Sequence, residues 1–158
     1  MKFKKILVPT DFSDAAKYAL EYAIELAGLY KGRLILIHVH EPMVYFSDAP
    51  MAMPDIVDVE QSIVASAENT LQKVYDDLIK NKETEHGLEP AELIIAQGKP
   101  FIEIIKTAKE KEADLIVMST HGRSALEHML LGSVTEKIVR KAPCPVLTVR
   151  AGGTFTMP

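Results

Sequence analysis

Short apolar runs alternate along the chain with longer segments in which apolar residues recur every three or four positions. Most of the runs are continuous rather than alternating, which predicts strands that are covered on both faces, as in a parallel sheet. The five runs lie at residues 6–8, 34–37, 93–95, 115–118 and 146–149.

The segments between the runs have the period of helices with one apolar face. The first follows Ser13, its expected N-cap, and is expected to end at Gly32. The second spans residues 56–82 and carries one apolar stripe along its length. A third begins at Pro100, a residue suited to the first helical position, and a fourth follows Gly132.

Strand and helix therefore alternate along the chain, which predicts a three-layer α/β domain with right-handed crossovers. No repeat or linker interrupts the pattern, so we expect residues 1–150 to form one domain. The tail at 151–158 has no periodicity and is expected to be disordered. Residues 41–54, with three prolines and three methionines, are long and irregular enough to form a mobile loop.

Length and composition agree with one hydrophobic core. The chain has 158 residues, of which 47% are hydrophobic, and such a chain buries about 68–70% of its unfolded surface without a disulfide or a structural metal. Lys and Arg number 18 against 22 Asp and Glu, a net charge of −4 that argues against a general nucleic-acid binder. The sequence shows no signal peptide and no membrane-spanning run, and its single cysteine, Cys144, suits a reducing compartment. We expect a cytoplasmic protein with neither a nucleic acid nor a membrane as partner.

Candidate chemistry lies beyond the carboxyl ends of the strands, where an open parallel sheet binds its ligand at the reversal of strand order. Two segments have this position, residues 8–13 after the first strand and residues 119–135 after the fourth. Gly122 can bring bare backbone against a ligand. Gly132 opens a helix whose first N–H groups, with the positive end of the helix dipole, favour an anion.

Both segments also have a purely structural interpretation. Ser133 and Glu136 would form a capping box, in which each side chain binds a backbone N–H of the helix start. Asp11 could accept hydrogen bonds from the hydroxyls of a ribose, or it could cap the first helix together with Thr10 and Ser13. The residues alone favour the cap in both cases.

Other candidate residues carry weaker signals. His38 and His40 share one face of a strand, as two metal ligands can, but no third ligand is near, which favours packing. Ser124 lacks the second glycine of a nucleophile elbow. Cys144 has no neighbouring cation that would favour its thiolate. Neither a Walker A motif nor a dinucleotide-binding fingerprint occurs.

Four motifs taken together resemble those of the universal stress protein family. They are V-P-T-D-F-S at 8–13, I-H-V at 37–39, M-S-T-H-G-R-S at 118–124 with G-S-V-T-E at 132–136, and A-P-C-P-V-L at 142–147. The match is in register from residue 4 to about residue 150. The resemblance implies a Rossmann-like, adenine nucleotide alpha-hydrolase-like fold with an open sheet of five parallel strands in the order 3-2-1-4-5. It also implies a homodimer and, in one branch of the family, bound ATP.

The resemblance further implies where ATP would lie. Adenine would lie near Pro9 and the backbone of Val39, ribose near Asp11 and the end of the fourth strand, and the phosphates at the two glycine segments. The implied binding residues are Pro9, Thr10, Asp11, Val39, Met118, Ser119, Gly122, Arg123, Gly132, Ser133, Val134 and Thr135. Because no Walker-type lysine is present to neutralise the triphosphate, we expect Mg²⁺ to accompany ATP.

One residue departs from the family's G-x-x-G-x9-G-[ST] loop, because Ser119 stands in place of the first glycine. If this position requires a left-handed backbone, serine costs about 1–2 kcal/mol relative to glycine. If it requires only close approach, the added hydroxyl either crowds the ribose or donates to it. The nine-residue spacer at 123–131 keeps the family's length.

The strand at 145–150 also bears on assembly, because no helix follows it. In the order 3-2-1-4-5 this strand lies at the edge of the sheet with one row of backbone groups unpaired. Two copies of one edge satisfy each other by antiparallel pairing about a twofold axis. We therefore expect a homodimer joined through this strand, as the resemblance also implies.

Three functional hypotheses follow. The first is an ATP-binding regulatory module of the stress response, the second a nucleotide-independent dimer of the same fold, and the third a slow ATP hydrolase or phosphotransferase. The glycine loop, with Gly122 and Gly132, favours the first hypothesis over the second. The sequence places no obvious base beside a γ-phosphate, so we assign no catalytic residue and expect at most slow hydrolysis.

Overall fold

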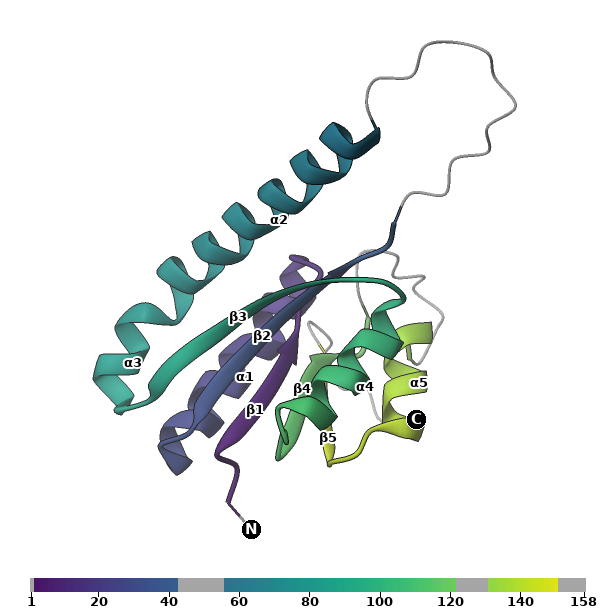
Figure 1. The fold of residues 1–158 in the computed structure, drawn as a ribbon. Helices are drawn as coiled ribbons and strands as arrows, with labels where there is room; N and C mark the ends of the chain where they lie inside the picture. Colours follow the sequence, from purple (N-terminus) through teal and green to yellow (C-terminus); the bar gives the residue numbers. More distant parts are fainter. Residues whose placement is uncertain (1, 43–55, 122–130, 151–158) are drawn as a thin grey trace, which may run out of the picture.

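A computed structural model describes residues 2–42, 56–121 and 131–150 of the chain (Figure 1). Five strands form one sheet, and every strand pairing in it is parallel. The spatial order is β3-β2-β1-β4-β5, which confirms both the predicted fold class and the order implied by the resemblance. The strands are β1 (Lys5–Pro9), β2 (Arg33–His40), β3 (Glu89–Gln97), β4 (Leu115–Ser119) and β5 (Val146–Val149).

Helices cover both faces of this sheet and complete the three layers (Figure 1). One face carries α1 (Asp14–Tyr30), α2 (Ile56–Leu78) and α3 (Lys80–His86), and the other carries α4 (Pro100–Glu110) and α5 (Ser133–Lys141). Successive residues of a strand point to opposite faces, so Ile6 and Val8 join the first core whereas Leu7 joins the second.

Burial falls from the centre of the sheet to its edges. The apolar run of β1 is at most 1% exposed, as predicted for a strand covered on both faces. The two edge strands differ from this expectation, because the run of β3 is half-buried throughout and Leu147 of β5 is 37% exposed. Continuous apolar runs therefore do not distinguish central strands from edge strands in this chain.

The first helix begins as predicted and ends differently. Ser13 caps α1, but the left-handed residue after the helix is Lys31, with φ 49°, and not Gly32. Gly32 is required for another reason, because a Cβ there would come within 2.8 Å of the carbonyl oxygens of Phe3 and Lys4. The glycine permits a close backbone approach between the helix end and the chain that enters β1.

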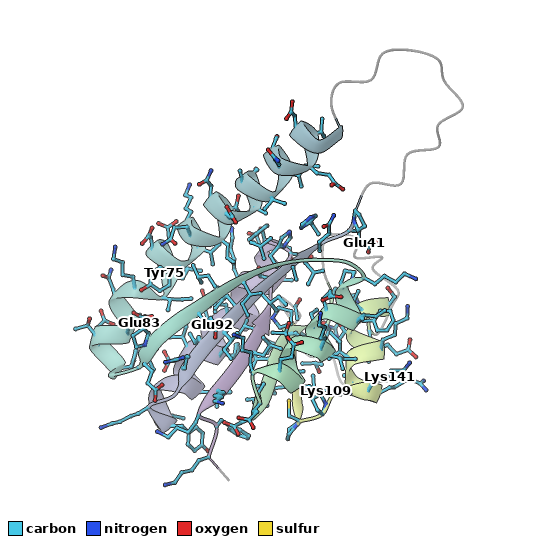
Figure 2. All side chains as sticks on the ribbon, in the orientation of Figure 1. Glu41, Tyr75, Glu83, Glu92, Lys109 and Lys141 are labelled. Carbon is cyan, nitrogen blue, oxygen red and sulfur yellow. The ribbon has the colours of Figure 1, made fainter. Side chains whose placement is uncertain are left out.

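The helix predicted at residues 56–82 is in fact two helices, and the second ends later. Ile79 lies between α2 and α3, where it is fully buried. The hydroxyl of Tyr75 donates to Glu83 at 3.0 Å across this junction, and both residues are labelled in Figure 2. The second helix stops at Gly87, whose φ of 65° favours glycine. An uninterrupted helical period does not reveal this junction, because backbone hydrogen bonds of helical spacing continue through it, from Ile79 to Tyr75 at 2.9 Å and from Glu83 to Ile79 at 3.0 Å.

The expected loop at 41–54, apart from residues 41 and 42, and the expected tail at 151–158 lie outside the described residues. Among the helices that the structure describes, none is both long enough and apolar enough to cross a membrane.

Candidate functional site

A cavity of about 280 Å³ lies at the carboxyl ends of β1 and β4. These are the strands at which the sheet order reverses, the position where ligands bind in open α/β sheets. Its walls are apolar on the side of β2 and α4, and polar beside the β1–α1 turn and the start of α5. The lining residues are Pro9, Thr10, Asp11, Ala16, Ile37, Val39, Pro100, Ile104, Met118, Ser119, His121, Gly132, Ser133, Val134 and Thr135.

The structure brings ten of the twelve residues predicted for the site around this one cavity. The other two, Gly122 and Arg123, lie outside the described residues. That these residues bind ATP stays a prediction.

Several lining residues were missed from the sequence. Ile37 shares a strand face with Val39, so the two-residue period of a strand could have indicated it. Pro100 and Ile104 come from α4, and only the crossing of α4 over the sheet brings them to the cavity.

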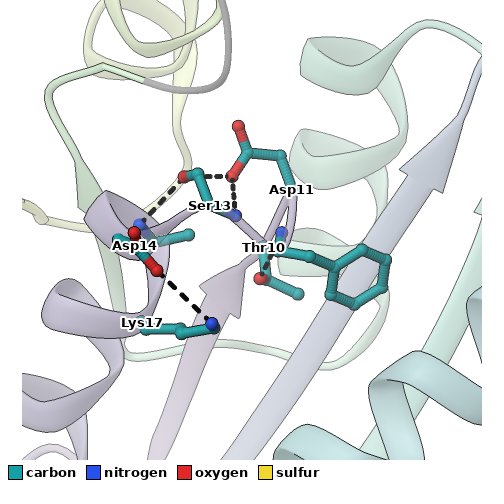
Figure 3. A network of polar contacts seen from close by, with 7 residues as sticks. Thr10, Asp11, Ser13, Asp14 and Lys17 are labelled. Carbon is teal, nitrogen blue, oxygen red and sulfur yellow. Dashed lines mark hydrogen bonds and ion pairs between the residues drawn. The ribbon is translucent and has the colours of Figure 1, made fainter.

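The turn between β1 and α1 is braced by its own side chains (Figure 3). Oδ1 of Asp11 accepts hydrogen bonds from the backbone N–H of Ser13 at 3.0 Å and from its hydroxyl at 2.5 Å. The Ser13 oxygen in turn accepts from the N–H of Ala16, at 3.2 Å, and so caps α1. Asp11 thus supports the cap and also lines the cavity, so the structural and the ligand-binding interpretations are compatible.

The structure answers part of the question that Ser119 raised. The described non-glycine residues with positive φ are Phe12, Lys31 and Glu112, so Ser119 needs no left-handed backbone and carries no strain of that kind. Its side chain is nearly buried, and the hydroxyl donates to the carbonyl oxygen of His121 at 2.6 Å. Serine at this position therefore holds the first turn of the chain beyond β4.

The start of α5 has no capping side chain. Its N-cap is Gly132, which donates its N–H to the carbonyl oxygen of Thr120 at 2.8 Å. The predicted capping box is wrong, because Ser133 is already inside the helix and Glu136 pairs instead with Arg140 at 3.0 Å. The first N–H groups of α5, with the positive end of its dipole, thus lie at the cavity, and no capping side chain among the described residues binds them.

The buried Thr135 ties α5 to the end of β4. Its hydroxyl donates to the carbonyl oxygen of Ser119 at 3.1 Å. This bond fixes the helix start against the strand that forms the other wall of the cavity.

Two ionisable side chains stand among the described residues that line the cavity. Asp11 and His121 line it, and Nδ1 of His121 lies 2.9 Å from the hydroxyl of Thr120. Within residues 2–42, 56–121 and 131–150, no three His, Cys, Asp or Glu side chains gather as a metal-binding group. Cys144 is not among the lining residues, and burial, followed by the charge of Asp114, raises the pKa of its thiol. The site is therefore suited to holding an anion by backbone amides.

Comparison with known proteins identifies the family. The sequence model described as "Universal stress protein family" matches residues 2–150. Universal stress protein YxiE of Bacillus subtilis is 36% identical over 151 residues, which cover 94% of this chain and 99% of the relative. Universal stress protein MJ0577 of Methanocaldococcus jannaschii is 35% identical over 155 residues, with 94% and 95% covered. The chain belongs to the universal stress protein family.

Solved structures agree with this fold. The structure of MJ0577 superposes with a TM-score of 0.78 at 29% identity, covering 98% of this chain and all of that one. A universal stress protein in complex with cAMP has a TM-score of 0.66 at 24% identity, covering 95% and 98%. One from Archaeoglobus fulgidus in complex with dAMP has a TM-score of 0.61 at 23% identity, covering 94% and 98%. At these identities the two complexes establish the fold alone.

Proposed function

We propose that this chain binds ATP, together with Mg²⁺, and acts in the cytoplasm as a nucleotide-dependent regulatory module. The observation that carries this proposal is the start of α5, which lies at the cavity at the strand reversal. There the N-cap is Gly132, and no described side chain caps the first backbone amides of the helix. Backbone amides at a helix N-terminus are an anion-binding arrangement. The cavity has backbone amides at one end and an apolar wall beside them. A phosphate chain attached to an apolar base fits this arrangement.

The rest of the cavity supports a nucleoside. Ile37 and Val39 offer an apolar surface for a base, and Asp11, at the mouth of the braced turn, offers a carboxylate for ribose hydroxyls. The volume of about 280 Å³ is near the lower end of the roughly 300–1,000 Å³ typical of small-molecule pockets. The family members in complex with cAMP and dAMP bind adenine nucleotides on this fold, whereas for this chain the proposal rests on its own cavity.

Mg²⁺ would neutralise the triphosphate when ATP is bound. This ion keeps several waters and is commonly held by substrate phosphates with one or two carboxylates. Asp11 is the carboxylate among the described lining residues.

We expect hydrolysis to be slow. Among the described residues, the start of α5 offers the phosphates backbone amides and the hydroxyls of Ser133 and Thr135, which hold charge but do not activate water. One oxygen of Asp11 already accepts two hydrogen bonds from Ser13, which lowers its capacity to act as a general base.

Calorimetry with ATP and Mg²⁺ tests the proposal, together with thermal unfolding. A ligand at 100 times its dissociation constant stabilises a fold by about 2.7 kcal/mol. Wild type should therefore give a heat of binding in calorimetry and a higher unfolding temperature. Gly132→Val should abolish both, because a Cβ at this position already lies 3.3 Å from the carbonyl oxygen of Thr120 and the branched side chain enters the amide-lined end.

Gly87→Ala provides the control for general destabilisation. Its Cβ would enter open space, but the φ of 65° strains the backbone, so this variant should lose stability and still bind. If wild type gives neither a heat of binding nor a higher unfolding temperature, the alternative hypothesis of a nucleotide-independent dimer is correct.

We also propose a homodimer through residues 145–150. Within the described residues β5 pairs on one side only, with β4, and Leu147 is 37% exposed. Antiparallel pairing of this edge with its copy would satisfy the second row of backbone groups.

A further inference from the structure

A histidine of β2 holds the β1–α1 turn from the side. Nδ1 of His38 lies 2.8 Å from the carbonyl oxygen of Thr10. Because a carbonyl oxygen only accepts, this nitrogen carries the proton. The imidazole ring also stacks on Phe12, with 4.2 Å between centroids and 26° between planes. His38 therefore contacts the residues on both sides of Asp11.

The turn adopts a conformation that needs such support. Phe12 has a φ of 65°, which residues with a side chain rarely adopt and which persists where the surroundings hold it. Its N–H donates to the hydroxyl oxygen of Thr10 at 3.1 Å, and the N–H of Thr10 donates to the carbonyl oxygen of Ile37 at 2.9 Å. Both backbone groups of Thr10 are thus bound by neighbouring residues of β2.

His38 does not itself line the cavity. Leu36, two residues earlier on β2, belongs to the core beneath α1 and α2, whereas Ile37 and Val39 face the other layer and the cavity. Alternation along a strand places His38 on the same face as Leu36, where it stacks on Phe12. Among the described residues, the contacts of His38 with Thr10 and Phe12 connect it to the cavity through the turn.

We infer that His38 is a positioning residue of the site: it fixes Thr10 and Phe12 so that Asp11 between them faces the cavity. The inference rests on the proposed function. It also explains why a half-buried histidine follows Ile37 where an apolar residue would fit the core, since an apolar side chain could not donate to Thr10.

Three variants at this position separate the two contacts. His38→Asn keeps a nitrogen donor near the position of Nδ1 and removes the ring, His38→Phe keeps a stacking ring and removes the donor, and His38→Leu removes both. Calorimetric affinity for ATP with Mg²⁺ should fall about tenfold in His38→Leu, the effect of losing one well-placed hydrogen bond and its neighbouring contact. The Asn and Phe variants should each retain part of the affinity.

Two further measurements distinguish positioning from general stability. Amide hydrogen exchange of Phe12 and Ser13, measured without nucleotide, should become faster in His38→Leu, because these N–H groups donate within the turn. His40→Leu is the matched control. His40 lies two residues further along β2, and its ring nitrogens are buried without a hydrogen-bond partner in the described residues, so its replacement should leave affinity unchanged.

A double-mutant cycle identifies the route of the effect. If His38 acts through Asp11, Asp11→Asn and His38→Leu together should weaken binding by clearly less than the product of the two single losses. Additive losses, or wild-type affinity in His38→Leu, would overturn the inference. If wild type binds no nucleotide, the proposed function fails, and amide exchange decides the positioning inference alone: faster exchange in His38→Leu supports it, and unchanged exchange overturns it.

Discussion

Ser119 is the position at which this chain departs from the family's glycine loop, and its replacement tests what the serine does. In Ser119→Ala the hydroxyl is lost and the carbonyl oxygen of His121 loses the donor that now lies 2.6 Å away. One such hydrogen bond contributes about 1 kcal/mol net. In a chain of 158 residues this corresponds to a fall in Tm of roughly 2–4 °C. Ser119→Gly adds the cost of glycine within a strand, about 0.5–1 kcal/mol more.

The two variants should behave differently in stability and alike in binding. Because the Ser119 hydroxyl donates to His121 and does not crowd a ribose, removing it should not increase the affinity for ATP. Thermal unfolding and calorimetry of wild type, Ser119→Ala and Ser119→Gly provide the comparison. Ser133→Ala, which removes an exposed hydroxyl of the same cavity, is the control for thermal stability alone. A gain of tenfold or more in affinity for Ser119→Gly would refute this reasoning, as would full wild-type stability in Ser119→Ala.

Three other predictions concern assembly, turnover and the thiol. Light scattering at micromolar concentration should give the mass of two chains for wild type and of one chain for Leu147→Pro, which removes an N–H from the ladder; a dimeric proline variant would place the interface elsewhere. Phosphate release under excess ATP and Mg²⁺ should stay far below the typical enzyme turnover of about 10 per second. Turnover near that value which disappears in His121→Ala would instead indicate an enzyme. Because burial raises the pKa of the Cys144 thiol, less thiolate is present at pH 8, and iodoacetamide should alkylate the folded protein more slowly than the unfolded chain; equal rates would contradict this.

Much of the fold could be predicted from local patterns. Each strand coincides with an apolar run, and Ser13 and Pro100 stand at the helix starts that their chemistry predicts. The errors arise where tertiary contacts decide the outcome. The junction at Ile79 divides a segment that is periodic throughout, and the close approach to Phe3 explains Gly32 better than a left-handed turn does.

The site was predictable in position but not in its internal contacts. Strand order, known here from the resemblance, places the cavity, and ten predicted residues line it. The sequence could not show that Gly132 rather than Ser133 is the N-cap, because the two differ by one residue in the register of α5. Nor could it connect His38 with Thr10, since their contact depends on the conformation of a turn 28 residues earlier in the chain.

Identifying the nucleotide that accompanies the purified protein tests the central proposal most directly. The chain is isolated without added nucleotide, denatured, and the released small molecules are measured by mass spectrometry, with Gly132→Val purified in parallel. We expect an adenine nucleotide, ATP or its hydrolysis product, from wild type and none from the variant. Absence of any nucleotide from wild type, persisting after incubation with ATP and Mg²⁺ followed by gel filtration, would contradict the proposal that this cavity binds ATP.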